Sequence, residues 1–130
     1  MATEEAIRRT LAAYCQTCDD GRFDEFVTLF AADAVFVVPP GPPTEGREAI
    51  RGFMEAGYKP EVRGKHLLGE PLITVSGESG ESATALTDFV FVGRGDGGQW
   101  GIVVAGRYDD ELRREVDGCW RFTRRTITML

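Results

Sequence analysis

The stretch Ser82-Ala-Thr-Ala-Leu-Thr-Asp-Phe-Val-Phe-Val-Gly-Arg94 decides the fold, because its β-branched and aromatic residues predict a long β-strand. The turn sequence Gly95-Asp-Gly-Gly98 follows and closes a hairpin with a second long strand over Gln99–Glu115. After a further turn at Val116-Asp-Gly118, a last strand is predicted over Cys119–Met129. The carboxyl-terminal part of the chain is therefore predicted to be an antiparallel meander.

Two more strand-like segments lie upstream of the meander. Lys65–Ser76 is rich in leucine, isoleucine and valine, and Ala34–Val38 is a short β-rich run that the cluster Pro39–Pro43 ends. Because proline cannot donate to a sheet, this cluster predicts a stiff loop or rim. Gly101 and Gly106, inside the long strand, predict bulges or bends where the sheet curls.

Apolar residues at helical spacing predict three helices, over residues 4–19, residues 24–32 and Arg47–Gly57, with Thr44 as a possible cap of the third. Helices that precede a meander define an α+β domain, in which they pack on one face of the sheet. We therefore expect residues 1–130 to form a single cone-shaped domain. Its three helices should cover a strongly curved, mostly antiparallel sheet around an apolar pocket.

Composition narrows the functional classes. The net charge is −6, with 15 basic and 21 acidic residues, so no basic stripe is available for nucleic acid. No apolar run has the roughly 20 residues that a membrane span needs, and the charged start of the chain predicts a cytoplasmic protein. Cys15 and Cys18 form a C-x-x-C inside the first helical pattern, with Cys119 far away, which favours small core residues over a disulfide or a metal site.

Three polar residues stand where the pattern favours apolar ones. His66, the single histidine, opens a predicted strand, and Asp19 closes the first helix, where the helix dipole disfavours a carboxylate. Tyr14 falls on the buried face of that helix, so its hydroxyl needs a partner. Each of these residues also has an ordinary structural explanation.

A second set lies in the meander. By alternation, Asp88 shares a face with Leu86 and Val90 and would be buried if that face points inward. A buried carboxylate needs a partner, which either Arg124 or Arg125 can supply, since only one of these neighbours can point inward. No nucleophile elbow, phosphate loop or metal cluster occurs, so no cofactor and no metal are expected.

The sequence resembles nuclear transport factor 2-like proteins of the SnoaL-like group over nearly its whole length. The segments that carry the resemblance are Tyr14-x4-Asp19, Asp20-Gly-Arg-Phe-Asp24-Glu-Phe-Val-x-Leu-Phe30, Glu45-Gly-Arg-Glu-Ala-Ile-Arg-Gly-Phe53, Lys65-His66-Leu-Leu-Gly69, Gly106-Arg-Tyr108 and Asp117-Gly-Cys-Trp120-Arg-Phe. The resemblance implies the cone-shaped fold and, since this fold hosts catalytic and non-catalytic domains, two functional alternatives.

The first alternative follows the dehydratase-like branch, which includes scytalone dehydratase, bile-acid 7α-dehydratase and hexachlorocyclohexane dehydrochlorinase. In these enzymes an aspartate after the first helix and a histidine opening the strand after the third helix form a pair, and Asp19 and His66 occupy these places. The resemblance also implies pocket roles for Tyr14 and Asp88, and it favours Arg125 over Arg124. Ketosteroid isomerase fits less well, because its general base would fall near Val37 or Val38.

With the pair in contact, His66 would be a general base and Asp19 would fix its tautomer. Tyr14 would donate to a developing enolate, and Arg125 would stabilise a leaving anion or neutralise Asp88. We therefore expect a cofactor-independent lyase or isomerase acting on a small hydrophobic cyclic substrate. The second alternative is a non-catalytic ligand-binding or scaffold domain like the small subunit of ring-hydroxylating dioxygenases. The family further implies a homodimer or homotrimer.

Overall fold

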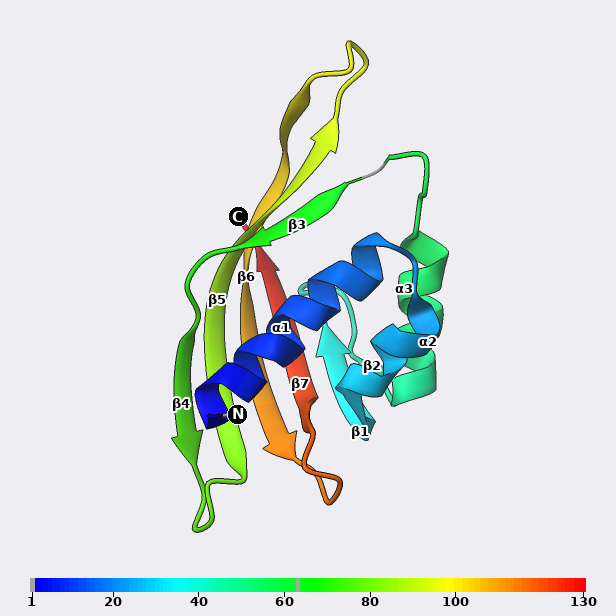
Figure 1. Ribbon diagram of the computed structural model, residues 1–130. Coiled ribbons are helices and arrows are strands. Elements are labelled where there is room, and N and C mark those ends of the chain that lie inside the picture. Colours follow the sequence, from blue (N-terminus) through cyan, green and yellow to red (C-terminus); the bar gives the residue numbers. More distant parts are fainter. Residues whose placement is uncertain (1, 63) are drawn as a thin grey trace.

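The computed structural model describes residues 2–62 and 64–130 and places the helices on one face of a curved sheet (Figure 1). The helical elements are α1 (Thr3–Asp19), α2 (Phe23–Phe26) with the 3₁₀ turn η1 (Val27–Leu29), and α3 (Arg47–Gly57). The strands are β1 (Phe30–Val37), β2 (Thr44–Glu45), β3 (Lys65–Leu68), β4 (Leu72–Ser76), β5 (Ser82–Arg94), β6 (Trp100–Arg114) and β7 (Trp120–Met129). The predicted α+β class is thus confirmed.

The strands form one mixed sheet in the order β2-β1-β7-β6-β5-β3, and β4 pairs with the other half of β5. All pairings are antiparallel except that of β1 with β7, so the sheet is mostly antiparallel, as predicted. The strand-like run Lys65–Ser76 is two strands, because Pro71 between them cannot donate to a ladder. Long strands β5 and β6 continue past the body of the sheet as a projecting hairpin (Figure 1).

The region after α1 differs from its prediction. Residues 24–32 are not one helix: α2 and η1 end at Leu29, and Phe30 already begins β1, where it pairs with Phe122 of β7. Both phenylalanines are fully buried, so pairing within the core overrides the helical spacing. Thr44 does not cap α3. It belongs to β2, where it pairs with Phe36 of β1, and the cap position of α3 is Gly46.

Gly106 also has a different role from the one predicted. It keeps a regular register with Phe89 of β5 and Met129 of β7. The β5–β6 pairing is irregular between Phe91 and Val92, and the β6–β7 pairing is irregular between Glu111 and Leu112. A Cβ at Gly106 would lie 2.8 Å from the Phe89 ring and 2.6 Å from the Thr128 carbonyl oxygen. This glycine therefore lets the Phe89 side chain lie flat against β6, and the bends come from the irregularities instead.

Helix α1 lies across the concave face of the sheet and closes the core (Figure 1). Its buried face includes Ile7, Leu11 and Tyr14, and the Thr10 hydroxyl donates to the Trp120 carbonyl oxygen at 2.9 Å. Cys15 is part of this core, and all three cysteines are free. Among the described helices, none is long and apolar enough to cross a membrane.

Candidate active site

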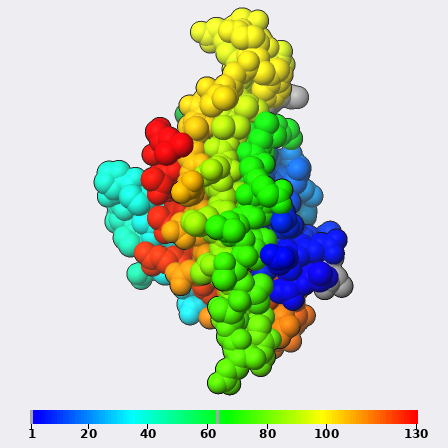
Figure 2. Space-filling view, turned by 90° about the vertical axis from the view of Figure 1, so that its left-hand side faces the viewer, coloured from blue at the N-terminus to red at the C-terminus, as the bar shows by residue number. Residues whose placement is uncertain are grey.

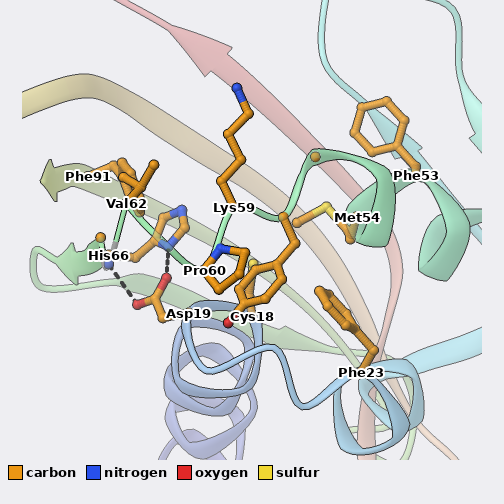
Figure 3. A pocket seen from close by; sticks show the side chains of 13 residues that line it. Cys18, Asp19, Phe23, Phe53, Met54, Lys59, Pro60, Val62, His66 and Phe91 are labelled. Atoms are coloured by element: carbon orange, nitrogen blue, oxygen red, sulfur yellow. Dashed lines mark hydrogen bonds and ion pairs between the residues drawn. The ribbon is translucent and has the colours of Figure 1, made fainter.

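Two adjoining pockets occupy the cone between the helices and the sheet. The helix-side pocket, about 330 Å³, is lined by Cys18, Asp19, Phe23, Phe53, Met54, Gly57, Tyr58, Lys59, Pro60, Val62, Gly64, His66 and Phe91 (Figure 3). The sheet-side pocket, about 320 Å³, is lined by Tyr14, Phe36, Val38, Phe53, Met54, His66, Phe89, Phe91, Val104, Tyr108, Ile127 and Met129. Both linings are mostly apolar, and His66 belongs to both. Each volume suits a small organic ligand.

Asp19 and His66 are joined by two hydrogen bonds. The His66 Nδ1 lies 2.6 Å from Asp19 Oδ1, and the backbone N–H of His66 donates to Asp19 Oδ2 at 2.8 Å (Figure 3). The Asp19 side chain is only 4% exposed, so the two donors of His66 compensate the burial of its charge at the end of α1. The expected contact between the two residues is therefore present.

This contact bears on which nitrogen of His66 is free. An ionised carboxylate can only accept, so a hydrogen bond from Nδ1 to ionised Asp19 requires the tautomer of neutral His66 in which Nδ1 carries the proton and Nε2 keeps its lone pair. Figure 3 shows Nε2 on the side of the ring away from Asp19. The ring is held by Phe91, with centroids 4.7 Å apart, and by Phe89 at 5.9 Å. A basic nitrogen is thereby fixed in an apolar surrounding.

Tyr14 reaches the sheet-side pocket from α1 and is 1% exposed. Its ring makes an edge contact with the His66 ring at 6.5 Å. Burial raises the pKa of the Tyr14 phenol, and the nearby Arg125 guanidinium opposes that rise. The hydroxyl therefore stays protonated over the whole physiological range and can donate a hydrogen bond.

Arg125 points inward, as the resemblance suggested, but its partner is Asp110 and not Asp88. The two residues pair across β6 and β7, and Nε and Nη2 of Arg125 donate to the two carboxylate oxygens at 2.7 and 2.8 Å. Both side chains are fully buried. Burial lowers the pKa of Arg125, but the Asp110 carboxylate outweighs burial and raises it; burial raises the pKa of Asp110, which Arg125 opposes. Arg125 is therefore a permanent buried cation.

The prediction that Asp88 is a pocket residue is wrong. Its side chain is 68% exposed and accepts a hydrogen bond from Arg107 at 2.7 Å on the convex face of the sheet. The Arg107 side chain lowers the pKa of this carboxyl. Asp88 would be buried only if its face of β5 pointed inward, but the inward face is the one with Ala85 and Phe89, and Leu86 beside Asp88 is exposed.

Sequence reasoning missed Tyr108 and Asp110. Both lie on the concave face of β6 with Leu112, at the i, i+2 and i+4 positions of Tyr108-Asp-Asp-Glu-Leu112. This alternation of buried and exposed residues was a usable signal. It was obscured because two aspartates stand side by side and only one of them, Asp110, points inward.

Cys18 lies next to the pair, and its sulfur, an Asp19 oxygen and a His66 nitrogen all lie within 4.8 Å of one another. Ligand atoms about 2.0–2.3 Å from a tetrahedral zinc ion are more than about 3.2 Å apart. The 2.6 Å between His66 and Asp19 is instead a hydrogen-bond distance, so the two side chains would have to separate to hold a metal. Burial raises the pKa of the Cys18 thiol to about 12, with the Asp19 charge as the next cause.

These features define a class of protein, a helix-covered α+β cone with an apolar pocket and a histidine–aspartate contact on the pocket lining. Residues 1–126 match the model of the SnoaL-like domain, so the chain belongs to the SnoaL-like family of nuclear transport factor 2-like folds. No curated protein is similar enough to match the sequence.

Several solved structures are similar, among them three proteins from Novosphingobium aromaticivorans. The first is a nuclear transport factor 2-like protein with a cystatin-like fold (26% identity, TM-score 0.86, covering 98% of this chain and 81% of that one). The second is a candidate scytalone dehydratase (25% identity, TM-score 0.79, covering 98% of this chain and 83% of that one). The third is the β subunit of a candidate aromatic-ring-hydroxylating dioxygenase (26% identity, TM-score 0.77, covering 96% of this chain and 87% of that one). A candidate dehydratase and a subunit of a candidate dioxygenase thus share this fold.

Proposed function

We propose that the protein is a cofactor-independent lyase or isomerase that removes a proton from an activated carbon of a small hydrophobic cyclic substrate. One observation carries the proposal: His66 Nδ1 lies 2.6 Å from Asp19 Oδ1, and the same ring lines two apolar cavities, where Nε2 can accept a proton from a ligand. A fixed imidazole base and a largely apolar ligand space are the two parts that such a reaction needs.

We assign the residues the following roles on the basis of their positions. His66 Nε2 accepts the proton from the substrate carbon, and Asp19 stabilises the imidazolium that forms. Tyr14 donates a hydrogen bond to the oxygen on which negative charge develops. The carbanion equivalent then expels a leaving group in a β-elimination, or it is reprotonated at another carbon in a double-bond shift. Apolar neighbours such as Phe53 and Met54 exclude water from these steps.

The proposal is tested on the step that both reactions share. 2-Tetralone, a bicyclic ketone with an activated C–H bond, is incubated in D₂O with the purified protein, and deuterium incorporation is followed by mass spectrometry. We expect exchange faster than in buffer and dependent on His66. Exchange at the buffer rate for 2-tetralone and for a panel of related cyclic ketones would count against the proposal.

A non-catalytic scaffold is the second candidate, favoured by the 26% identity to a dioxygenase β subunit. In such a domain the cavity has no reaction to support, and a short contact between a histidine and a carboxylate on its lining is not required. The present chain has both a cavity and this contact. The exchange experiment separates the two candidates. A scaffold domain would bind cyclic ketones without speeding up the exchange of their protons, whereas the proposed enzyme would speed it up.

We further propose that the chain forms a homodimer or homotrimer through the convex face of its sheet. This face, which the helices leave uncovered, fills much of Figure 2. Exposed apolar side chains lie along its strands and the projecting hairpin: Leu67, Leu72, Leu86, Trp100 and Ile102. Such an apolar surface is typical of an interface. Sedimentation equilibrium should give two or three times 14.3 kDa, and the double variant Leu72→Lys/Leu86→Lys should shift the mass toward the monomer. A monomeric wild type would contradict the proposal.

A further inference from the structure

We infer that Tyr108 is a second catalytic hydrogen-bond donor, which acts with Tyr14 on one oxygen atom of the substrate. The inference rests on the proposed function, and it narrows the substrate to a compound with an oxygen on the carbon next to the one that His66 deprotonates. A cyclic ketone is the simplest member of this class.

Tyr108 lies on β6 and lines the sheet-side pocket together with His66 and Tyr14. Its side chain is 1% exposed, and its ring centroid is 5.6 Å from that of Tyr14. A purely apolar core position would be filled equally well by phenylalanine, as at neighbouring Phe89 and Phe122. Two buried phenols on one pocket wall thus place two O–H donors where the rest of the lining is mostly apolar.

The Tyr108 ring is held rigidly. It stacks on the Phe89 ring, with centroids 4.2 Å apart and an interplanar angle of 14°. The Arg125 guanidinium lies over the Tyr108 ring at 3.7 Å and over the Tyr14 ring at 4.2 Å. A donor that is fixed before the reaction requires no reorganisation while charge develops, and this is the condition for effective oxyanion stabilisation.

Arg125 also supplies charge behind the two phenols. Two of its nitrogens bind Asp110, while Nη1 is buried without a hydrogen-bond partner among the described residues. The guanidinium lies over the faces of both phenol rings, so its positive charge lies close to the place where the substrate oxygen becomes negative. Burial, followed by the neighbouring Tyr14, raises the pKa of Tyr108, so it remains a neutral donor.

The proposed step is balanced without any co-reactant. His66 Nε2 takes the proton from the carbon next to the carbonyl group, and the C–H electron pair forms the new C=C bond. The carbonyl π electrons move to oxygen, and the resulting enolate oxygen accepts one hydrogen bond from Tyr14 and one from Tyr108. An oxygen anion has lone pairs for both donors, whereas a single donor would leave part of its charge uncompensated in an apolar pocket.

The test uses 4-nitrophenol, whose phenolate form resembles an enolate and is measured by its visible absorbance. We expect the wild type to bind the phenolate. Tyr108→Phe and Tyr14→Phe should each weaken that binding about tenfold, since a hydrogen bond to a charged group is lost. The same loss is expected for Tyr108→Phe in a His66→Ala background. The experiment needs no turnover, so it separates this inference from the proposed proton transfer.

A second measurement needs no substitution. The chain has three tyrosines, so labelling them with ¹³C at Cζ gives three signals. On addition of 4-nitrophenolate we expect the Tyr14 and Tyr108 signals to shift. The inference is overturned if the Tyr108 signal stays in place, if Tyr108→Phe binds the phenolate as tightly as the wild type, or if the wild type does not bind it.

Discussion

Replacing His66 with glutamine is expected to lower the rate of proton removal from 2-tetralone by about 10²–10⁴-fold, the usual contribution of a positioned general base. Glutamine keeps a polar side chain of similar reach but has no basic nitrogen. Asp19→Asn should reduce the rate by about 10²-fold or more, because an amide no longer enforces the tautomer with a proton on Nδ1. Deuterium exchange, measured as an initial rate under saturating ketone, gives both effects.

The matched control for Asp19 is its neighbour Asp20, whose side chain is 43% exposed and lies 3.6 Å from Lys65. Asp20→Asn makes the same chemical change one residue further along and should leave the exchange rate unchanged. If His66→Gln and Asp19→Asn retained rates similar to that of Asp20→Asn, the assigned roles would be wrong. Thermal unfolding of each variant shows whether a lost rate reflects lost structure.

Removing the charge of Asp110 is expected to have the largest effect on stability. Asp110→Asn keeps the volume of the side chain but leaves the Arg125 cation fully buried without its counter-charge. Breaking one side of a buried ion pair costs about 3–5 kcal/mol, a large part of the stability of a domain of this size. The free energy of unfolding from urea titration measures this loss.

Asp88→Asn is the control for this effect. Asp88 is also a carboxylate paired with an arginine across two strands, but its partner Arg107 lies on the exposed face. Water and salt screen such a pair, so the variant should unfold close to the wild-type midpoint. In the double variant Asp110→Leu/Arg125→Met both charges of this buried pair are gone, and much of the stability should return. An Asp110→Asn protein as stable as Asp88→Asn would contradict the account of the core.

The sequence predicted the overall architecture well, because the order of the elements, with helices before a meander of strands, determines the fold class. The hairpin turn at Gly95–Gly98 and the helix Arg47–Gly57 carry their own local signals, and the family resemblance placed Asp19 and His66 together. Local signals failed where tertiary pairing decides. Phe30 has helical spacing to its neighbours, yet it enters the sheet because Phe122 is there to pair with it.

The site was only partly predictable for a similar reason. Alternation tells which residues share a face of a strand, but it does not tell which face is concave. Asp88 and Asp110 lie on adjacent strands and are equally plausible partners for Arg125 in the sequence. The register of β6 against β7, which places Asp110 opposite Arg125, decides between them and is visible only in the folded chain.

The proposed proton transfer requires a particular nitrogen of His66 to be unprotonated, and one spectrum shows which nitrogen carries the proton. Because the chain has a single histidine, a long-range ¹H–¹⁵N spectrum of the imidazole shows only His66. In the neutral form we predict a proton on Nδ1, held by Asp19, and a free lone pair on Nε2. In Asp19→Asn the preference for this tautomer should weaken. A neutral His66 with its proton on Nε2 would contradict the assignment of this residue as the general base.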